Sequence, residues 1–212
     1  MDQARAASPL RKTWRFIWHD NSIWSWLANI ALAFVLIKFV VFPGLGWLLD
    51  TSHPLVAVIS ESMEHDLPFD RWWGEQEGIF AQFGISRQMF LEFDYPSGFN
   101  KGDIMVLRGA DAGEIAVGDV IVFTDGISEP FIHRVVQVSD GPVYRTKGDH
   151  NPISIVDYRN AAGERVPKGT LGAIRLLDET DIRQEQVIGK AAFRVPFFGY
   201  LKVWAVELLR LF

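Results

Sequence analysis

The chain has 212 residues, of which 49% are apolar and 22% charged, and its net charge at pH 7 is −5. This composition is typical of a folded protein and excludes wholesale disorder, while the acidic balance argues against nucleic acid as a partner. Cysteine is absent, which excludes disulfides, thiolate catalysis and sulfur-ligated zinc. The length is sufficient for one domain with appendages.

The first strong feature along the chain is an apolar run from Ile23 to Phe42, twenty residues with a single charge at Lys38. About 20 apolar residues are enough for a helix to cross the hydrocarbon core of a bilayer. Lys38 lies near one end, where its side chain can reach the headgroups. Pro43 and Gly44, and then Gly46, suit the exit from that helix. We therefore expect a transmembrane anchor, assigned to residues 23–49.

The charges before this run predict its orientation. Residues 1–22 carry more basic than acidic side chains: Arg5, Arg11, Lys12 and Arg15 against Asp2 and Asp20. The positive-inside rule then predicts a cytoplasmic tail at residues 1–22 and an extracytoplasmic location after about residue 50. A cleavable signal peptide is one alternative, but its apolar core is normally about 7–15 residues and ends at a small-residue cleavage site. A buried core helix is the other, which the length and the flanking tryptophans disfavour.

Beyond the anchor, short β-type runs alternate with turn signals. These runs are Leu55–Ile59, Ile104–Leu107, Val120–Phe123, Phe131–Val138, Val143–Thr146 and Leu171–Leu177. Several strands at this spacing, separated by turns such as Gly-Asp, favour a compact antiparallel β domain. We assign that domain to residues 50–196. The predicted fold class is therefore mainly β, with a single N-terminal transmembrane helix.

Two aromatic-rich segments depart from the β pattern. Residues 66–99 contain many tryptophans and phenylalanines, and their glycines argue against one long helix. This insertion either packs against the β domain or forms a lipid-dipping flap beside the active site. The C-terminal residues 197–212 are apolar except for Lys202, Glu207 and Arg210. They predict a short amphipathic helix at the membrane interface.

A serine, a histidine and an aspartate follow the anchor in chain order. Ser62 lies in Ser60-Glu61-Ser62-Met63, His133 in Ile132-His133-Arg134-Val135, and Asp149 in Lys147-Gly148-Asp149-His150-Asn151. Serine becomes a strong nucleophile only when a base takes its proton and a third group orients that base. A metal site at the cluster Glu61, Glu64, His65 and Asp66 is not expected, because the His-Glu-x-x-His spacing is missing. No cofactor is expected either.

These motifs resemble signal peptidase I of the archaeal and endoplasmic-reticulum type. In that family the nucleophile lies in a Ser-x-Ser-Met motif, the base in His-Arg-Val, and the acid near Lys-Gly-Asp-x-Asn. The resemblance continues into Val195-Pro196-Phe197-Phe198-Gly199-Tyr200, so it covers nearly the whole chain. The bacterial branch uses a lysine base immediately before an arginine. His133 occupies that position here, which places the chain with the histidine-using branch.

The resemblance also implies roles for individual residues. Ser62 is expected to be the nucleophile and His133 the base. Asp157 is expected to complete the triad while Asp149 supports the site, although the spacing is slightly longer than expected, so both aspartates stay candidates. The hydroxyl of Ser60 and the main-chain N–H of Ser62 are expected to form the oxyanion hole.

Three residues depart from the common pattern of the family. Glu61 stands where many relatives carry glycine, His65 takes a place often held by proline, and His150 replaces the commoner asparagine or alanine.

The strand before Ser60 is the expected substrate-binding segment. An extended peptide would add to it as a further strand, beside Leu55, Val56, Val58 and Ile59. The resemblance implies a serine endopeptidase of the cell membrane that cleaves signal peptides from secretory preproteins after small residues at −1 and −3. The lipid bilayer and the protein-translocation channel are the further expected partners. The alternatives are a non-catalytic, membrane-tethered subunit that binds precursors, and a self-processing protease of the repressor-cleavage type.

Overall fold

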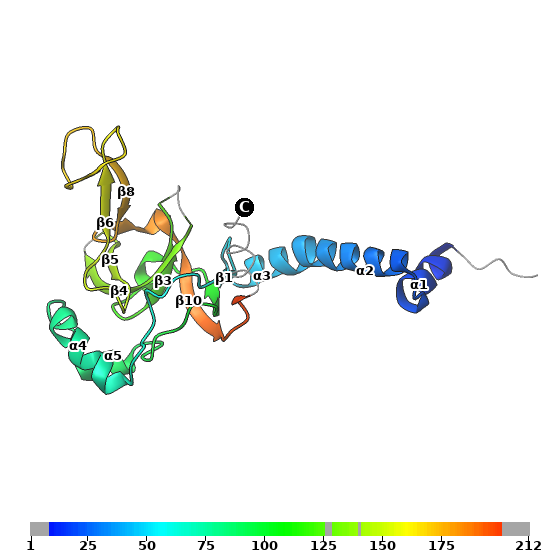
Figure 1. Ribbon diagram of the computed structural model, residues 1–212, viewed down its shortest axis with the longest axis horizontal. Coiled ribbons are helices and arrows are strands. Elements are labelled where there is room, and N and C mark those ends of the chain that lie inside the picture. Colours follow the sequence, from blue (N-terminus) through cyan, green and yellow to red (C-terminus); the bar gives the residue numbers. More distant parts are fainter. Residues whose placement is uncertain (1–8, 126–128, 140, 201–212) are drawn as a thin grey trace, which may run out of the picture. The chain divides into compact units, whose positions relative to one another are not determined.

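The computed structural model describes residues 9–125, 129–139 and 141–200. The chain divides into two compact units, Met1–Leu48 and Leu49–Phe212, and each is described by itself (Figure 1). The first unit is helical. Its elements are α1 (Pro9–His19), α2 (Ile23–Leu36), the π-helical turn η1 (Ile37–Val41) and α3 (Phe42–Leu48).

Helices α1 and α2 form a short helical hairpin. The side chain of Ser22 caps α2 by accepting the N–H of Ser25, as expected for a serine at this position. The hydroxyl of Ser25 donates to the carbonyl of Phe16 at 2.5 Å, and Asn29 Nδ2 donates to the carbonyl of Ile17 at 2.8 Å. These two bonds hold the end of α1 against the beginning of α2.

The apolar helix does not end at Pro43. It continues from Ile23 to Leu48, 26 residues that are long and apolar enough to cross a membrane by length and composition. Directly before the proline, the N–H of Phe42 bonds to the carbonyl of Ile37, five residues back. A proline ring clashes with the carbonyl four residues earlier and supplies no N–H. The wider π-turn accommodates both effects, so the helix continues through Pro43, Gly44 and Gly46, which were expected at its exit, and ends at Leu48.

The second unit is mainly β, as expected, and all its strand pairs are antiparallel. A seven-stranded sheet has the order β1-β2-β10-β3-β4-β5-β9, and a three-stranded sheet has the order β7-β6-β8. Figure 1 shows β6 and β8 extending away from the larger sheet. The strands are β1 (Leu55–Ala57), β2 (Ile104–Arg108), β3 (Val120–Phe123), β4 (Phe131–Ser139), β5 (Val143–Lys147), β6 (Val156–Arg159), β7 (Arg165–Val166), β8 (Ile174–Asp178), β9 (Ile182–Arg183) and β10 (Val187–Val195). Two 3₁₀ turns, η2 (Ala112–Glu114) and η3 (Gln184–Gln186), complete the connections.

The long strand β10 was not among the expected runs, yet it lies between β2 and β3 in the larger sheet. The run of apolar residues that would mark it as a strand is interrupted by Gly189 and Lys190. A Cβ atom on Gly189 would lie 2.7 Å from the carbonyl oxygen of Arg108. The glycine therefore permits a close approach between backbones, which the period-2 signal of a strand does not reveal.

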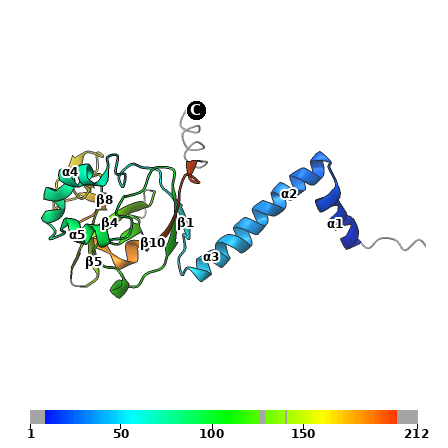
Figure 2. The same ribbon diagram turned by 90° about the horizontal axis from the view of Figure 1, so that it is seen from below.

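The insertion between β1 and β2 forms two short helices, α4 (Phe69–Ala81) and α5 (Arg87–Glu92). Trp72, Phe80 and Phe90 are fully buried, in a cluster that includes Val136 of β4. Both views show the two helices beside the β4 side of the domain (Figures 1 and 2). This burial favours packing over a lipid-dipping flap. The expected C-terminal helix lies mostly at residues 201–212, outside the described part of the chain.

Candidate active site

Ser62 follows β1 in a turn whose main chain is held from two directions. The next residue, Met63, is buried in the core, and its carbonyl accepts the N–H of Phe99 at 3.1 Å. The carbonyl of Ser62 accepts the N–H of His150 at 2.9 Å. The main chain at Ser62 is thus fixed by contacts to segments far away in the sequence.

His133 lies on β4, between β3 and β5 in the larger sheet, and is 2% exposed. Its Nε2 lies 2.9 Å from Ser62 Oγ, the separation expected of a nucleophile and its base. Ser60 comes two residues before Ser62, and its Oγ lies 3.1 Å from Ser62 Oγ. The structure therefore brings together three of the residues selected from the sequence.

The other ring nitrogen of His133 contacts a residue that the sequence analysis did not select. Nδ1 is hydrogen-bonded to the carboxylate of Glu179, whose side chain is completely buried. The same carboxylate accepts the hydroxyl of Thr146 at 2.9 Å and the N–H of Ile155. Glu179 directly follows β8, and its carbonyl accepts the N–H of Thr146. No motif in Leu177-Asp178-Glu179-Thr180 marks this position.

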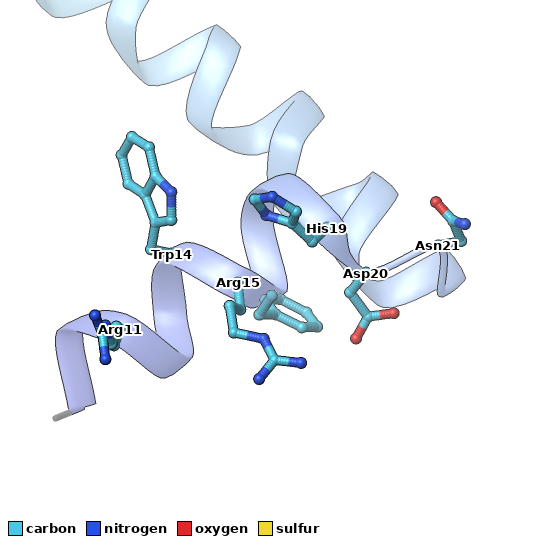
Figure 3. Close-up of a pocket in the computed structure, with 7 residues that line it drawn as sticks. Arg11, Trp14, Arg15, His19, Asp20 and Asn21 are labelled. Atoms are coloured by element: carbon cyan, nitrogen blue, oxygen red, sulfur yellow. The ribbon is translucent and has the colours of Figure 1, made fainter. Parts of the chain in front are cut away.

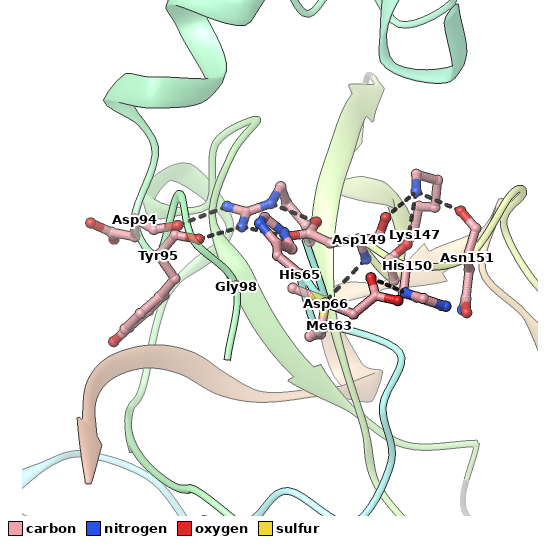
Figure 4. Close-up of polar contacts among 12 residues, drawn as sticks. Met63, His65, Asp66, Asp94, Tyr95, Gly98, Lys147, Asp149, His150 and Asn151 are labelled. Carbon is pink, nitrogen blue, oxygen red and sulfur yellow. Dashed lines mark hydrogen bonds and ion pairs between the residues drawn. The ribbon is translucent and has the colours of Figure 1, made fainter. Parts of the chain in front are cut away.

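Asp149 is buried within the loop Lys147–Asn151, and its partner is an arginine. Arg134 Nε and Nη2 donate to its two oxygens at 2.9 and 2.8 Å. His65 Nε2 lies 3.1 Å from the same carboxylate, and Figure 4 shows the side chains of His65 and Asp149 close together. Burial alone raises the pKa of Asp149, but the charge of Arg134 and the hydrogen bonds from His65 and Arg134 outweigh it and hold the pKa well below its usual range. Asp149 is therefore a permanently charged partner of Arg134.

Asp157 lies on β6 in the three-stranded sheet. Its carboxylate accepts hydrogen bonds from Arg165 Nε at 3.1 Å and Arg159 Nη2 at 3.3 Å. Its side chain is 15% exposed, and those of both arginines are more exposed still. In the described part of the chain, the carboxylate that contacts the ring of His133 is that of Glu179. The sequence had led us to expect Asp157 or Asp149 in this role.

Lys147 is buried beside this loop and holds it in shape. Its Nζ donates to the carbonyls of Gly148, Asp149 and Asn151 at 2.8, 3.1 and 2.6 Å. Burial lowers the pKa of Lys147 to about 8, although the charges of Asp149 and Glu179 oppose that shift. The three hydrogen bonds agree with the expectation that this lysine is structural.

The strand before the nucleophile forms one edge of the larger sheet. Among the described strands, β1 pairs only with β2. Val58 is 1% exposed and belongs to the core, and both its main-chain groups bond toward the interior, to Asp103 and Gly102. Of the four expected substrate contacts, Val58 thus has no side-chain surface to offer, whereas Leu55, Val56 and Ile59 are half-buried.

Two other features of the molecule are the acidic residues near Ser62 and a hollow in the first unit. In the acidic cluster considered for metal, Glu64 accepts the N–H of Lys101, and His65 turns to Asp149. The first unit has a hollow at the end of α1, lined by residues that include Arg11, Trp14 and Arg15 (Figure 3). This hollow contains none of the candidate catalytic residues.

Comparison with known proteins identifies the family. No protein-family model matches the chain. The signal peptidase complex catalytic subunit SEC11 of Tuber melanosporum is 31% identical over 188 residues, which cover 85% of this chain and 80% of that protein. The sec11 subunit of Schizosaccharomyces pombe is 27% identical over 173 residues (80% and 76%), and that of Pyrenophora tritici-repentis is 27% identical over 196 residues (85% and 82%). These similarities confirm the resemblance inferred from the motifs. The chain belongs to the signal peptidase I family of proteases, in the branch that contains the SEC11 catalytic subunits.

Proposed function

We propose that this protein is a membrane-anchored serine endopeptidase that cleaves signal peptides from secreted preproteins, with Ser62 as nucleophile and His133 as base. The observation that carries the proposal is the distance of 2.9 Å between Ser62 Oγ and His133 Nε2 in a member of this family. The names of the relatives describe catalytic subunits of a signal peptidase complex, which supports signal peptides as substrates. A non-catalytic binding subunit would not need this pair.

The proposed reaction follows the general course of serine proteolysis. Ser62 Oγ forms a bond to the scissile carbonyl carbon while its proton passes to His133 Nε2. When the tetrahedral intermediate collapses, the C–N bond breaks and His133 returns the proton to the leaving amine. His133 then takes a proton from a water molecule, whose oxygen attacks the acyl-enzyme. The ester C–O bond breaks, His133 returns the proton to Ser62 Oγ, and the carboxylic acid product leaves. A carboxylate at Nδ1 orients the imidazole throughout.

The oxyanion would be stabilised by the main-chain N–H of Ser62 and the hydroxyl of Ser60. The hydroxyl of Ser60 lies 3.1 Å from Ser62 Oγ. A small rotation of the Ser60 side chain would therefore direct this hydroxyl to the oxyanion on the carbon that Ser62 attacks. Removing one such donor typically lowers the rate by about 10²–10³-fold.

The substrate would bind as an additional strand on the free edge of β1. Main-chain groups along a strand alternate in direction, and those of Val58 point inward to Asp103 and Gly102. The groups of its neighbours Ala57 and Ile59 therefore point to the open edge, where a peptide can pair with them. Residues −1 and −3 of the substrate then share one face. Half-buried side chains such as Leu55 would leave only shallow space on that face, which suits small residues.

The apolar helix would hold this site close to the bilayer surface. In the proposed topology, residues 1–22 are cytoplasmic, 23–49 span the cell membrane, and 50–196 form the extracytoplasmic protease domain, with 197–212 at the interface. The exposed cations Arg11 and Arg15 on α1 support this orientation. A translocation channel that releases precursors at the same surface would be the natural neighbour.

The direct test is cleavage of a purified preprotein by the full chain in detergent micelles, alongside Ser62→Ala and His133→Ala. The wild type should cut after the small −1 residue, and each variant should lose at least about 10³-fold while keeping its near-ultraviolet circular dichroism. A preprotein with a bulky −1 residue is the matched control and should stay intact.

Three other results would change the proposal. Binding of the precursor without turnover, at any pH, would favour the tethered-subunit alternative. A shortened intact mass of the purified chain that depends on Ser62 would favour self-processing. Near-wild-type cleavage by His133→Ala would show that the base is misassigned.

A further inference from the structure

The side chains around His133 and Asp149 indicate which carboxylate orients the proposed base. Members of this family are expected to use an aspartate, and two aspartates stand near the expected positions. Neither contacts His133 in the described structure, because Asp149 is paired with Arg134 and Asp157 with Arg159 and Arg165. We infer that Glu179 is the positioning residue that orients His133, and that it takes the role expected of Asp157 or Asp149. The inference rests on the proposed function.

The hydrogen-bond chemistry assigns the tautomer. An ionised carboxylate can only accept hydrogen bonds. Because Nδ1 of His133 bonds to Glu179, Nδ1 must carry the proton. Nε2 is then an acceptor that faces Ser62 Oγ at 2.9 Å, as a general base must. Glu179 therefore selects the only neutral form of the ring that can deprotonate Ser62.

The electrostatic surroundings separate Glu179 from Asp149. Arg134 already neutralises Asp149 through two hydrogen bonds, so Asp149 has little charge left to stabilise a second cation. The described partners of Glu179 besides His133 are two neutral donors, the hydroxyl of Thr146 and the N–H of Ile155. The ammonium of Lys147 acts on both carboxylates but donates to main-chain carbonyls. When His133 takes the proton of Ser62, Glu179 is the buried anion that balances the new charge.

The backbone explains why a glutamate fits here. The main-chain N–H of Glu179 donates to the carbonyl of Ile155, and its carbonyl accepts the N–H of Thr146. Its side chain accepts hydrogen bonds from the same two residues, from the hydroxyl of Thr146 and the N–H of Ile155. The carboxylate is thereby fixed at both oxygens before any substrate binds. Such preorganisation is what an orienting group requires.

The test compares Glu179→Gln, Asp157→Asn and Asp149→Asn in the full chain in micelles, with wild type and Ser62→Ala as references. We expect Glu179→Gln to lower kcat by about 10³–10⁴-fold with little change in KM, because the amide favours the wrong tautomer. Its residual activity should rise with pH more steeply than that of the wild type. Asp157→Asn should keep kcat within about two-fold of the wild-type value, as for a surface substitution. Thr146→Val, which removes a neutral hydrogen bond to the same oxygen, should cost far less than Glu179→Gln.

A readout that does not need turnover completes the test. The downfield proton NMR signal of His133 Nδ1–H, identified by its loss in His133→Ala, should be present in wild type, Asp157→Asn and Ser62→Ala. In Glu179→Gln it should disappear or move upfield. If it persists unchanged there but is lost in Asp157→Asn, the inference is overturned. Full activity of folded Glu179→Gln, with Ser62→Ala inactive, overturns it while the proposed function stands. If the wild type cleaves nothing yet its signal depends on Glu179, the proposed function fails and the orienting contact is upheld.

Discussion

Two histidines with buried side chains, His133 and His65, each contact a buried carboxylate, but in different electrostatic settings. His133 faces Glu179, whose other described partners are neutral donors, and its second nitrogen faces Ser62. His65 faces Asp149, which Arg134 already neutralises, and its ring stacks on Trp72 with centroids 3.5 Å apart. The first pair can stabilise a proton that arrives during reaction. The second is part of the packing between the insertion and the β domain.

The difference shows that burial and proximity of a histidine and an acid do not define a catalytic group. The two regions differ in whether a fixed cation already neutralises the charge of the carboxylate. Arg134 also donates to the carbonyls of Asp94, Tyr95 and Gly118, so the Asp149 side joins the insertion to the sheet. In the proposed mechanism, the carboxylate of Glu179 orients His133, whereas that of Asp149 helps to join the insertion to the sheet.

The largest effect should come from removing the cation that distinguishes the two regions. Arg134→Met leaves Asp149 buried without its partner and should lower the free energy of unfolding by about 3–5 kcal/mol. Urea denaturation in micelles, followed by tryptophan fluorescence, measures the loss. Arg87→Met, which removes an exposed ion pair with Asp70 and a contact with the ring of Phe69, is the control and should cost less than about 1 kcal/mol.

A double variant tests the cause of that loss. Arg134→Met combined with Asp149→Asn should recover part of the stability, because no charge is then left unpaired. If the double variant is less stable by the sum of the two single losses, the buried charge is not the origin of the effect.

A methyl group in the loop between the two regions should affect the catalytic side. In Gly148→Ala, the new Cβ would lie 2.9 Å from His133 Nε2 and 2.7 Å from the carbonyl of Ser62. A shift of the reacting groups by about 1 Å can cost about 10²-fold, so kcat should fall by at least that factor. Gly113→Ala is the matched control, since nothing lies within 4 Å of its Cβ. Equal kcat values for the two variants would contradict the proposed place of Gly148.

The smallest expected effect is on the stability of the fold at acid pH, where the contributions of Asp149 and Asp157 should differ in size. Because the pKa of Asp149 is held below its usual value, its ionised form stabilises the fold above about pH 4, and this contribution is lost as pH falls through the lowered value. Asp149→Asn should therefore be less stable than wild type at pH 6 and should lose less stability on further acidification. Asp157, whose pKa is also lowered by its arginines, should show the same trend with a smaller amplitude, because its partners are exposed. Unfolding curves at pH 3, 4 and 6 measure the change in stability for both variants. A larger change for Asp157→Asn than for Asp149→Asn would contradict the prediction that Asp149 contributes more.

The sequence by itself determined the features that depend on local pattern. The apolar run predicted a helix long enough for a membrane, the alternating runs predicted antiparallel strands, and the ordered motifs indicated the family. Ser62 and His133 were selected as partners from these motifs, and their atoms lie within hydrogen-bonding distance. Such features can be predicted because helix length, strand period and motif order are all written in consecutive residues.

The tertiary structure decided what depends on contacts between distant segments. Glu179 reaches His133 only because the end of β8 is hydrogen-bonded to Thr146 and Ile155, and nothing in its own neighbours marks it. The position of β10 between β2 and β3 depends on the close approach of backbones at Gly189, and the helix passes Pro43 because a π-turn precedes it. The role of a buried carboxylate is settled by the charges that folding brings around it, since Coulomb interactions in a poorly polarisable interior depend on position in space and not on position in the chain.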